Sequence, residues 1–297
     1  MHIVYVTDGK AGHRSQALGL YKAMQRLSTQ QVTFEEVAAA SLSRVNLFLA
    51  RGHNQHTLIQ HAPDYIFSVG SQTQLKALLL GQVFPQAKTV VLMKPKFPFA
   101  WFDHVVVPKH DGVAAENNVI VTEGALNPIV NEKRHQAKRI LIALGGDSKR
   151  HKWNEAQVLA AIEKIVHDNK KSEIILTTSR RTPKQFLTQL NTQNFAAKLQ
   201  IFPVEATPQG WIFEQMQLAE AVWVTEDSVS MIYEALSAGC KVGGIATERL
   251  KQDRITQALD TLQQQNWIAY STALNNLPAP QQLKAADQVA LKVLHEN

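Results

Sequence analysis

The densest group of ionisable residues in the sequence lies in residues 7–17, between a short apolar run and an amphipathic stretch. Asp8, Lys10, His13 and Arg14 fall within seven positions of this segment. A carboxylate or an imidazole can accept a proton during a reaction, so Asp8 and His13 are the candidate catalytic residues. We favour Asp8 slightly as the base, because it directly follows the apolar run and because Lys10 and Arg14 would keep it ionised. The alternative is a structural turn in which Asp8 or Ser15 caps the following helix.

Two further loops, like the first one, combine glycine or arginine with the end of an apolar run. Gly12 in the first loop, and Gly145 and Gly146 in a later one, let the backbone come close to a ligand such as a diphosphate. Arg180 and Arg181 stand just before a predicted helix, where paired guanidinium groups suit a phosphate clamp. The simpler interpretations are a tight turn for the glycines and solvated surface charge for the arginines.

Residues 222–242 carry the most informative pattern, which consists of an apolar run, a polar loop, a helical stretch and a second apolar run. Asp227, Ser228 and Ser230 would lie at the N-terminus of the helix, where backbone amides and hydroxyl groups can hold a phosphate. Glu234 would follow one to two turns into the helix and can reach the diol of a ribose. The alternative is that Asp227 or Ser228 only caps the helix and that Glu234 is solvated.

Short runs rich in Val and Ile alternate with helical patterns along the whole chain, which predicts strand–helix repeats and parallel sheets. The expected strands are residues 3–7, 65–69, 89–93, 104–108, 119–122, 139–144, 173–178, 199–202, 221–225 and 241–245. The expected helices are residues 15–27, 73–80, 153–167, 182–190, 211–219, 230–238, 252–265 and 281–294. The pattern restarts after a polar stretch, so we expect an N-terminal domain at residues 1–136 and a C-terminal domain at residues 137–297. Two Rossmann-like domains whose parallel sheets face each other across a cleft form the GT-B architecture of the α/β class, with ligands bound beyond the carboxyl ends of the strands.

The composition is that of a globular protein, with 45% hydrophobic and 19% charged residues among 297. The single Cys240 can form no internal disulfide. No run approaches about 18 apolar residues, and the N-terminus resembles a strand and turn rather than a signal peptide, so we expect a cytoplasmic protein. The net charge of +6 is concentrated in residues 130–184, where 13 Lys and Arg stand against six Asp and Glu. Such a region attracts phosphates or anionic membranes, whereas the lack of a nucleic-acid motif argues against nucleic acid as a partner.

Six motifs together are similar to those of the mitochondrial-fission ELM family, which has many bacterial members and a plant branch. The motifs are TDGKAGH at residues 7–13 with Gln16, VPKHD at 107–111, TEGAL at 122–126, LGG at 144–146, TSRRTP at 178–183 and TEDSVSM at 225–231. They cover most of the chain. The resemblance implies the fold of the family and leaves the reaction of its bacterial members open.

A more distant resemblance is to the lipid-linked N-acetylglucosaminyltransferase of peptidoglycan synthesis. That enzyme has a first loop ending in Gly-His, a Gly-Gly loop opening its second domain and a ribose-binding Glu before Ala-Ala-Gly. The matching positions here are Gly12 and His13, Gly145 and Gly146, and Glu234. The resemblance implies that the second domain binds a nucleotide sugar, while the first domain binds the acceptor and supplies the base.

We therefore interpret the sequence as a GT-B glycosyltransferase that moves a sugar from a nucleotide sugar to a glycan or lipid-linked acceptor. Cell-envelope biosynthesis of the lipopolysaccharide type is the expected setting. Cationic side chains and helix dipoles can neutralise the leaving diphosphate, so we expect neither a metal ion nor a cofactor. An Asp-x-Asp motif, by which another glycosyltransferase fold binds metal, does not occur in the sequence.

One exposed-looking segment suggests where the acceptor lies. Residues 94–102 hold four aromatic residues and two lysines, which suits peripheral contact with an inner membrane or a lipid-linked acceptor. The alternative is that some of these aromatic residues belong to the core.

Two other functions stay open, a nucleotide-sugar epimerase or hydrolase on the same fold and a non-catalytic adaptor. The plant branch of the family, which is associated with recruitment of a dynamin-like protein to mitochondria, is the model for the adaptor.

Overall fold

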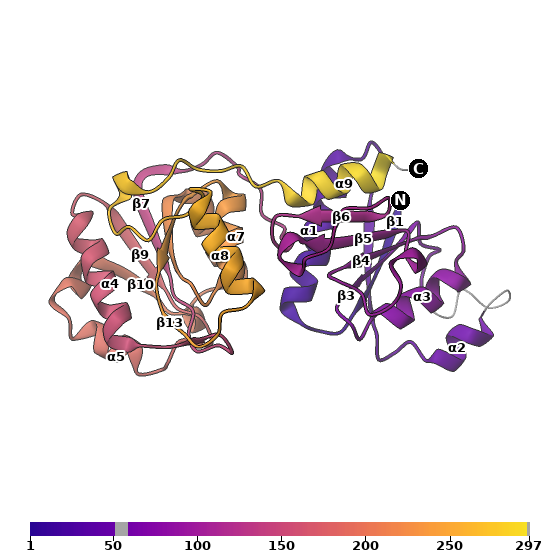
Figure 1. Cartoon of the computed structure of the whole chain (residues 1–297), viewed down its shortest axis with the longest axis horizontal. Coiled ribbons are helices and arrows are strands. Elements are labelled where there is room, and N and C mark those ends of the chain that lie inside the picture. Colours follow the sequence, from indigo (N-terminus) through magenta and orange to yellow (C-terminus); the bar gives the residue numbers. More distant parts are fainter. Residues whose placement is uncertain (51–58, 296–297) are drawn as a thin grey trace. The chain divides into compact units, whose positions relative to one another are not determined.

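The computed structural model describes residues 1–50 and 59–295. The chain divides into two compact units (Figure 1). The first unit contains residues 1–128 and 284–297, and the second contains residues 129–283. Each unit holds one parallel sheet with helices around it, which confirms the predicted α/β class.

The first unit is built on a six-stranded sheet in the order β2-β1-β3-β4-β5-β6, in which every neighbouring pair is parallel. Its strands are β1 (His2–Thr7), β2 (Thr33–Ala38), β3 (Tyr65–Val69), β4 (Lys88–Leu92), β5 (His104–Pro108) and β6 (Val119–Thr122). Its helices are α1 (Ala11–Leu27), α2 (Arg44–Leu49), α3 (Gln74–Val83) and α9 (Ala285–His295), with short 3-10 helices η2 (Phe99–Trp101) and η3 (Lys109–Asp111). The central strands β3 and β5 are buried along their whole length, as the near-continuous apolar runs predict.

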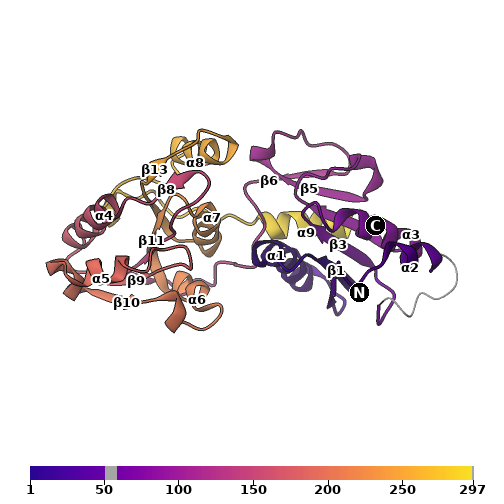
Figure 2. The same ribbon diagram turned by 90° about the horizontal axis from the view of Figure 1, so that it is seen from below.

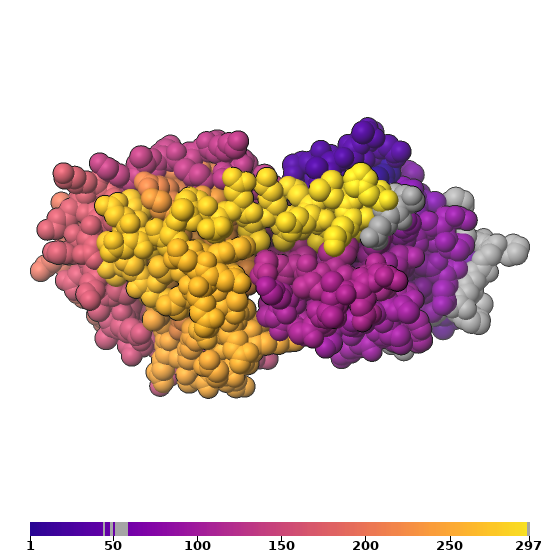
Figure 3. All heavy atoms as spheres, turned by 45° about the horizontal axis from the view of Figure 1, so that its top comes forward, coloured from indigo at the N-terminus to yellow at the C-terminus, as the bar shows by residue number. Residues whose placement is uncertain are grey.

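Helix α9 packs on the first unit, although the expected boundary placed it in the second domain. Val289, Ala290 and Val293 on one face of α9 are fully buried. Tyr65 donates a hydrogen bond from its hydroxyl to the carbonyl of Val293 over 3.2 Å, and Arg26 on α1 pairs with Asp287. Figure 3 shows α9 in yellow lying on the surface of this unit. The apolar face of α9 therefore completes the core of a unit that begins 284 residues earlier in the chain.

The second unit is built on a five-stranded parallel sheet in the order β10-β9-β7-β11-β12. Figure 2 labels β9, β10 and β11 of this sheet. Its strands are β7 (Gln136–Ala143), β9 (Glu173–Thr177), β10 (Leu199–Phe202), β11 (Ala219–Thr225) and β12 (Lys241–Ile245), with a small antiparallel ribbon of β8 (His151–Lys152) and β13 (Glu248–Arg249). Its helices are α4 (Glu155–Asp168), α5 (Phe186–Asn191), α6 (Trp211–Leu218), α7 (Val229–Ala238) and α8 (Arg254–Gln264), with 3-10 helices η4 (Asn194–Lys198), η5 (Val204–Ala206) and η6 (Leu274–Asn276). All predicted strands and helices are present, with ends displaced by a few residues.

Each sheet has one topological switch point. There, the chain first continues to strands on one side of a given strand and later returns to form strands on its other side. In the first unit the chain goes from β1 to β2 on one side and then to β3 on the other side. In the second unit the strands β9 and β10 lie on one side of β7, and β11 and β12 lie on the other. Loops diverge at the carboxyl ends of the strands there, which leaves room for a ligand. Within the described residues, no helix is both long enough and apolar enough to cross a membrane.

Candidate functional site

The switch point of the first unit holds a cluster of charged side chains around Asp8. His13 contacts the Oδ1 of Asp8 through its Nδ1 over 3.0 Å, and the Nζ of Lys10 contacts the Oδ2 over 2.9 Å. The backbone amide of Lys10 also donates to Asp8. These contacts arise because Asp8 directly follows β1 and His13 lies in the first turn of α1. Arg14, which we expected beside Asp8, instead pairs with Glu36 on β2.

The two candidate bases differ in their access to solvent. The side chain of Asp8 is 2% exposed and that of His13 is 17% exposed. Desolvation alone would raise the pKa of Asp8, but hydrogen bonds from Lys10 and His13 outweigh it and hold the pKa below its ordinary value. Because a carboxylate can only accept hydrogen bonds, the Nδ1 of His13 carries the hydrogen and the Nε2 is left as a proton acceptor. The geometry thus favours His13 over Asp8 as the group that meets a substrate.

Gly70 is a part of this cluster that the sequence pattern did not reveal. It follows β3, the strand next to β1, and has a left-handed φ of +81°. A Cβ at this position would lie 2.3 Å from the Cε1 of His13, so the imidazole rests directly against the backbone of Gly70. The ring is therefore fixed between two neighbouring strand ends. Gly12 lies in the same unit, exposed on the first turn of α1 with open space around it.

The switch point of the second unit brings five of the predicted binding residues together. The Oδ2 of Asp227 accepts from the Gly146 amide over 3.0 Å and from the Ser228 hydroxyl over 3.1 Å. The Nη2 of Arg181 lies 2.7 Å from the same oxygen and also donates to the Ser228 hydroxyl. The Asp227 side chain is 0% exposed, whereas that of Arg181 is 43% exposed. Ser228 is the N-cap residue of α7, but its hydroxyl makes no capping bond.

Both glycines of this loop are required because neighbouring loops pack closely against them. A Cβ at Gly145 would lie 2.1 Å from the Oδ2 of Asp227, and one at Gly146 would lie 2.0 Å from the carbonyl oxygen of Arg181. The Gly145 amide donates to the hydroxyl of Thr225 at the end of β11 over 2.7 Å. The pair of glycines therefore allows close packing of three loops, and the approach of their amides to a diphosphate stays a prediction.

Three other predicted residues lie near this cluster without joining it. Arg180 and Ser230 are exposed and have no hydrogen-bond or ion-pair partner among the described residues. Glu234 is half-buried on α7, and desolvation raises its pKa to about 7. Glu234 is still partly accessible to solvent, so both the ribose contact and the solvated alternative stay predictions. The amides at the start of α7, together with Arg180, Ser230 and Glu234, are the groups of this region that a ligand can use.

A second buried network lies beside Asp227, and no local pattern in the sequence predicts it. The carboxylate of Glu226 accepts from Arg249 over 2.9 Å and from the hydroxyl of Tyr270 over 2.8 Å. Arg249 also donates to Asp260, and the buried His151 ring lies 3.7 Å from Glu226. Desolvation lowers the pKa of His151 and raises that of Tyr270. This network ties the loops after β7, β11 and β12 together beneath the site.

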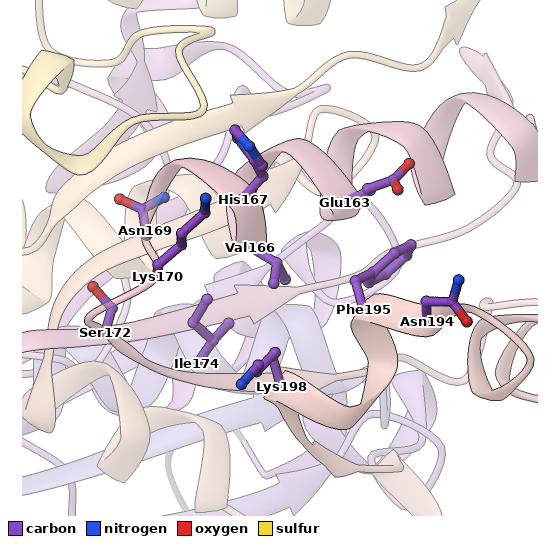
Figure 4. Close-up of a pocket in the computed structure, with 10 residues that line it drawn as sticks. All are labelled: Glu163, Val166, His167, Asn169, Lys170, Ser172, Ile174, Asn194, Phe195 and Lys198. Carbon is purple, nitrogen blue, oxygen red and sulfur yellow. The ribbon is translucent and has the colours of Figure 1, made fainter.

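A hollow of about 480 Å³ lies elsewhere in the second unit, between α4, β9 and η4 (Figure 4). Val166, Ile174 and Phe195 form its apolar wall, and Lys170 and Lys198 stand at its rim. It opens near the start of β9, away from the carboxyl ends where the predicted residues gather.

In the described part of the chain, no three His, Cys, Asp or Glu residues are grouped so that they could hold a metal ion.

The aromatic segment of residues 94–102 is divided between core and surface. Phe102 is buried, and Phe97 and Phe99 pack against the core around β5. Trp101 is 59% exposed and stacks on Phe97 with a distance of 5.9 Å between ring centroids. Lys94 and Lys96 are exposed in the same segment. The alternative that some of these aromatic residues belong to the core is thus confirmed, and contact with a membrane or a lipid-linked acceptor stays a prediction.

Comparison with known protein families settles the family. The model of the family described as "Mitochondrial fission ELM1" matches residues 11–296. The chain belongs to this family. Among curated relatives, the uncharacterized protein RP120 of Rickettsia prowazekii (strain Madrid E) is 24% identical, with 80% of this chain and 81% of that protein covered.

Solved structures share the fold of this ELM1-family protein at low sequence identity. The UDP-GlcNAc 2-epimerase of Methanocaldococcus jannaschii has a TM-score of 0.54 at 12% identity, over 100% of this chain and 99% of that one. Acinetobacter baumannii MurG has a TM-score of 0.51 at 14% identity, over 99% and 90%. The E. coli ADP-heptose lipopolysaccharide heptosyltransferase II has a TM-score of 0.50 at 12% identity, over 100% of both chains. The ELM1-family chain therefore has a GT-B, glycosyltransferase-like fold.

Proposed function

We propose that this ELM1-family protein is a glycosyltransferase that uses a nucleotide sugar. The observation that carries the proposal is the Asp8–His13 pair, a buried carboxylate that orients an imidazole at the switch point of the first sheet. A carboxylate that fixes the tautomer of a histidine is a common arrangement for accepting a proton from a hydroxyl group. A merely structural turn after β1 requires neither group.

In the proposed reaction, the Nε2 of His13 takes the proton of the acceptor hydroxyl. The acceptor oxygen then forms a bond to the anomeric carbon of the sugar, while the bond from that carbon to the diphosphate oxygen breaks. Asp8 holds the ring in place and stabilises its positive charge after proton transfer. The nucleoside diphosphate leaves with the electron pair of the broken bond.

The second unit would bind the nucleotide sugar. The N-terminus of α7 offers backbone amides that lack partners within the helix, and Arg180 and Ser230 stand exposed beside it. Glu234 would accept hydrogen bonds from the ribose hydroxyls. The cations and the helix dipole would neutralise the leaving diphosphate, so we propose transfer without a metal ion. A UDP-GlcNAc 2-epimerase and an ADP-heptose transferase share this fold, which supports a nucleotide sugar as the ligand.

The acceptor is proposed to be a glycan or a lipid-linked glycan of the cell envelope. The fold shared with a lipopolysaccharide heptosyltransferase supports that setting. The exposed Trp101 and the exposed Lys94 and Lys96 of the same segment suit peripheral contact with an anionic inner membrane, because tryptophan favours the interface and lysine favours anionic headgroups. Only the start of this segment lies at the carboxyl end of a strand, because Lys94 follows β4. Its aromatic part lies at the amino ends of the strands, where Asn118 before β6 donates to the carbonyls of Phe99 and Phe102.

The test is a thermal-shift screen of the whole chain with nucleosides, nucleoside diphosphates and their sugars, followed by calorimetry. A ligand at one hundred times its Kd stabilises the folded state by about 2.7 kcal/mol, which is readily measured. No binding to any nucleotide would reject the enzyme and favour the adaptor of the plant branch. For any nucleotide sugar that binds, incubation without an acceptor distinguishes transfer from the alternatives.

The epimerase or hydrolase stays the second candidate, because a UDP-GlcNAc 2-epimerase shares the fold over the full length of both chains. An epimerase would convert the donor alone into an epimer, and a hydrolase would release free sugar. A transferase would leave the donor largely intact until an envelope glycan is added.

A further inference from the structure

The carboxylate of Asp227 is held in the second unit by the kinds of donor that bind phosphate groups in proteins. Its Oδ2 receives a backbone amide of a Gly-Gly loop, a hydroxyl at a helix N-terminus and a guanidinium group. These three kinds of donor are the ones that phosphate sites in proteins use. The side chain is completely buried, so the anion is an internal part of the loop cluster.

The two oxygens of the Asp227 carboxylate have different surroundings. All three donors reach Oδ2, whereas Oδ1 is buried and has no hydrogen-bond partner among the described residues. A buried oxygen without a donor costs free energy, which reduces the cost of moving this side chain. The guanidinium of Arg181, in contrast to the buried carboxylate, is partly exposed. It also donates to the carbonyls of Gly146 and Asp147. Arg181 can therefore meet a ligand from solvent while it stays anchored to the loop.

We propose that Asp227 is a specificity-determining residue that acts as an internal competitor of the ligand's phosphate groups. A diphosphate takes over Arg181 and the Gly146 amide, and the carboxylate turns away from them. Because the carboxylate carries one negative charge itself, only a ligand with several negative charges replaces it effectively. This inference rests on the proposed nucleotide site in the second unit and adds to it the selection of diphosphates over nucleosides and monophosphates.

The alternative is that Asp227 positions Arg181 for the ligand and never leaves it. The two roles predict opposite signs for the same substitution. Asp227→Asn removes the negative charge with little change of shape. If the carboxylate competes, the variant binds inorganic pyrophosphate and nucleoside diphosphates about tenfold or more tightly than the unmodified protein, as removal of a like charge within a few ångströms implies. If the carboxylate positions Arg181, the variant binds them more weakly.

The experiment is calorimetry of the whole chain with inorganic pyrophosphate, the nucleoside diphosphates and the corresponding nucleosides. Asp168→Asn is the matched control, because it removes one charge from the same unit at the C-terminal end of α4. A gain that is confined to Asp227→Asn and larger for diphosphate than for nucleoside supports the proposal. Unchanged or weaker pyrophosphate binding by Asp227→Asn overturns it.

The measurement separates this inference from the proposed function. Diphosphate binding by the unmodified protein without a gain in Asp227→Asn rejects the competitor role and leaves the nucleotide site standing. No binding of any of these compounds to either protein rejects both. A melting temperature of Asp227→Asn close to that of the unmodified protein shows that its fold is retained, and Asp227→Ser tests the same charge removal with a smaller side chain.

Discussion

Each unit carries a buried carboxylate beside a nitrogen-bearing side chain at the switch point of its sheet, and the two pairs suit different tasks. In the first unit, Asp8 is buried and His13 keeps one ring nitrogen free. In the second unit, Asp227 is buried and Arg181 directs its guanidinium at the protein's own loops. Histidine gains and loses a proton near neutral pH, whereas arginine stays charged. The first pair can therefore transfer a proton, and the second can only bind and screen charge.

The largest expected effect is on turnover, which should depend on proton transfer by the Asp8–His13 pair and not by the Asp227–Arg181 pair. His13→Gln should lower turnover of the nucleotide sugar identified in the screen by about 10²–10⁴, because the amide can still contact Asp8 but cannot act as a base. Affinity for the nucleotide should not change, since the substitution lies in the first unit. Release of nucleoside diphosphate measures turnover, and calorimetry measures affinity. Turnover close to that of the unmodified protein would move the base elsewhere and leave this loop with a structural role.

A smaller effect is expected for Asp8→Asn, which keeps the shape of the side chain but removes the charge that stabilises the protonated imidazole. We expect turnover to fall by about ten- to a hundredfold. The substitution also has a signature in stability. The folded-state pKa of Asp8 is below its ordinary value, so ionised Asp8 stabilises the fold above about pH 4, and this contribution is lost as the pH falls further.

The melting temperature between pH 7 and pH 3 checks that signature. The unmodified protein should lose more stability on acidification than Asp8→Asn does. Parallel curves for the two proteins would show that the contacts of Asp8 with Lys10 and His13 contribute nothing measurable.

The neighbouring arginines of the second unit allow a matched comparison of stability. Arg181→Ala leaves the buried Asp227 without its cation and should lower the free energy of unfolding by about 1–3 kcal/mol. Arg180→Ala removes an exposed side chain that has no partner among the described residues, and it should change the free energy of unfolding by less than about 0.5 kcal/mol. Thermal unfolding measures both. Equal melting temperatures for the two variants would mean that the contact between Arg181 and Asp227 is ordinary surface charge.

The smallest expected effect concerns Glu234 and its pH dependence. Glu234→Ala should weaken nucleoside binding about tenfold, the typical contribution of a hydrogen bond to a charged group. Because its pKa is about 7, affinity should rise between pH 6 and pH 8 as the carboxylate ionises, and the variant should lose this rise. A nucleoside is the appropriate ligand, since it has no phosphate that titrates in this range. Glu163→Ala on α4 is the control, and an unchanged pH profile in Glu234→Ala would reject the ribose contact.

The parts of the molecule that were predictable from sequence depend on short distances along the chain. Asp8 and His13 lie within one segment, and a strand followed by a helix brings them together without help from the rest of the fold. The parallel sheets follow from apolar runs that are buried on both faces. Strand β2 was missed because it lies at the edge of the sheet and buries only Val37, so its pattern is weak.

The parts that were missed depend on contacts between distant segments. Gly70 lies 57 residues from His13, and its role appears only when β1 and β3 are neighbours. The network around Glu226 joins Arg249 and Tyr270 from other loops. The apolar stripe of α9 predicts a buried face but does not indicate which core covers it. Local patterns thus identified candidate residues, and the strand order determined which of them meet.

The placement of α9 in the first unit also imposes an order on synthesis. Residues 129–283 form a complete unit once they have left the ribosome, whereas the first unit lacks one of its helices until residue 295 has been added. At typical translation rates this delay is roughly 10–30 s. During that interval the apolar surface that α9 later covers is open to water and to chaperones. The half of the protein that is translated first is therefore the half that finishes folding last.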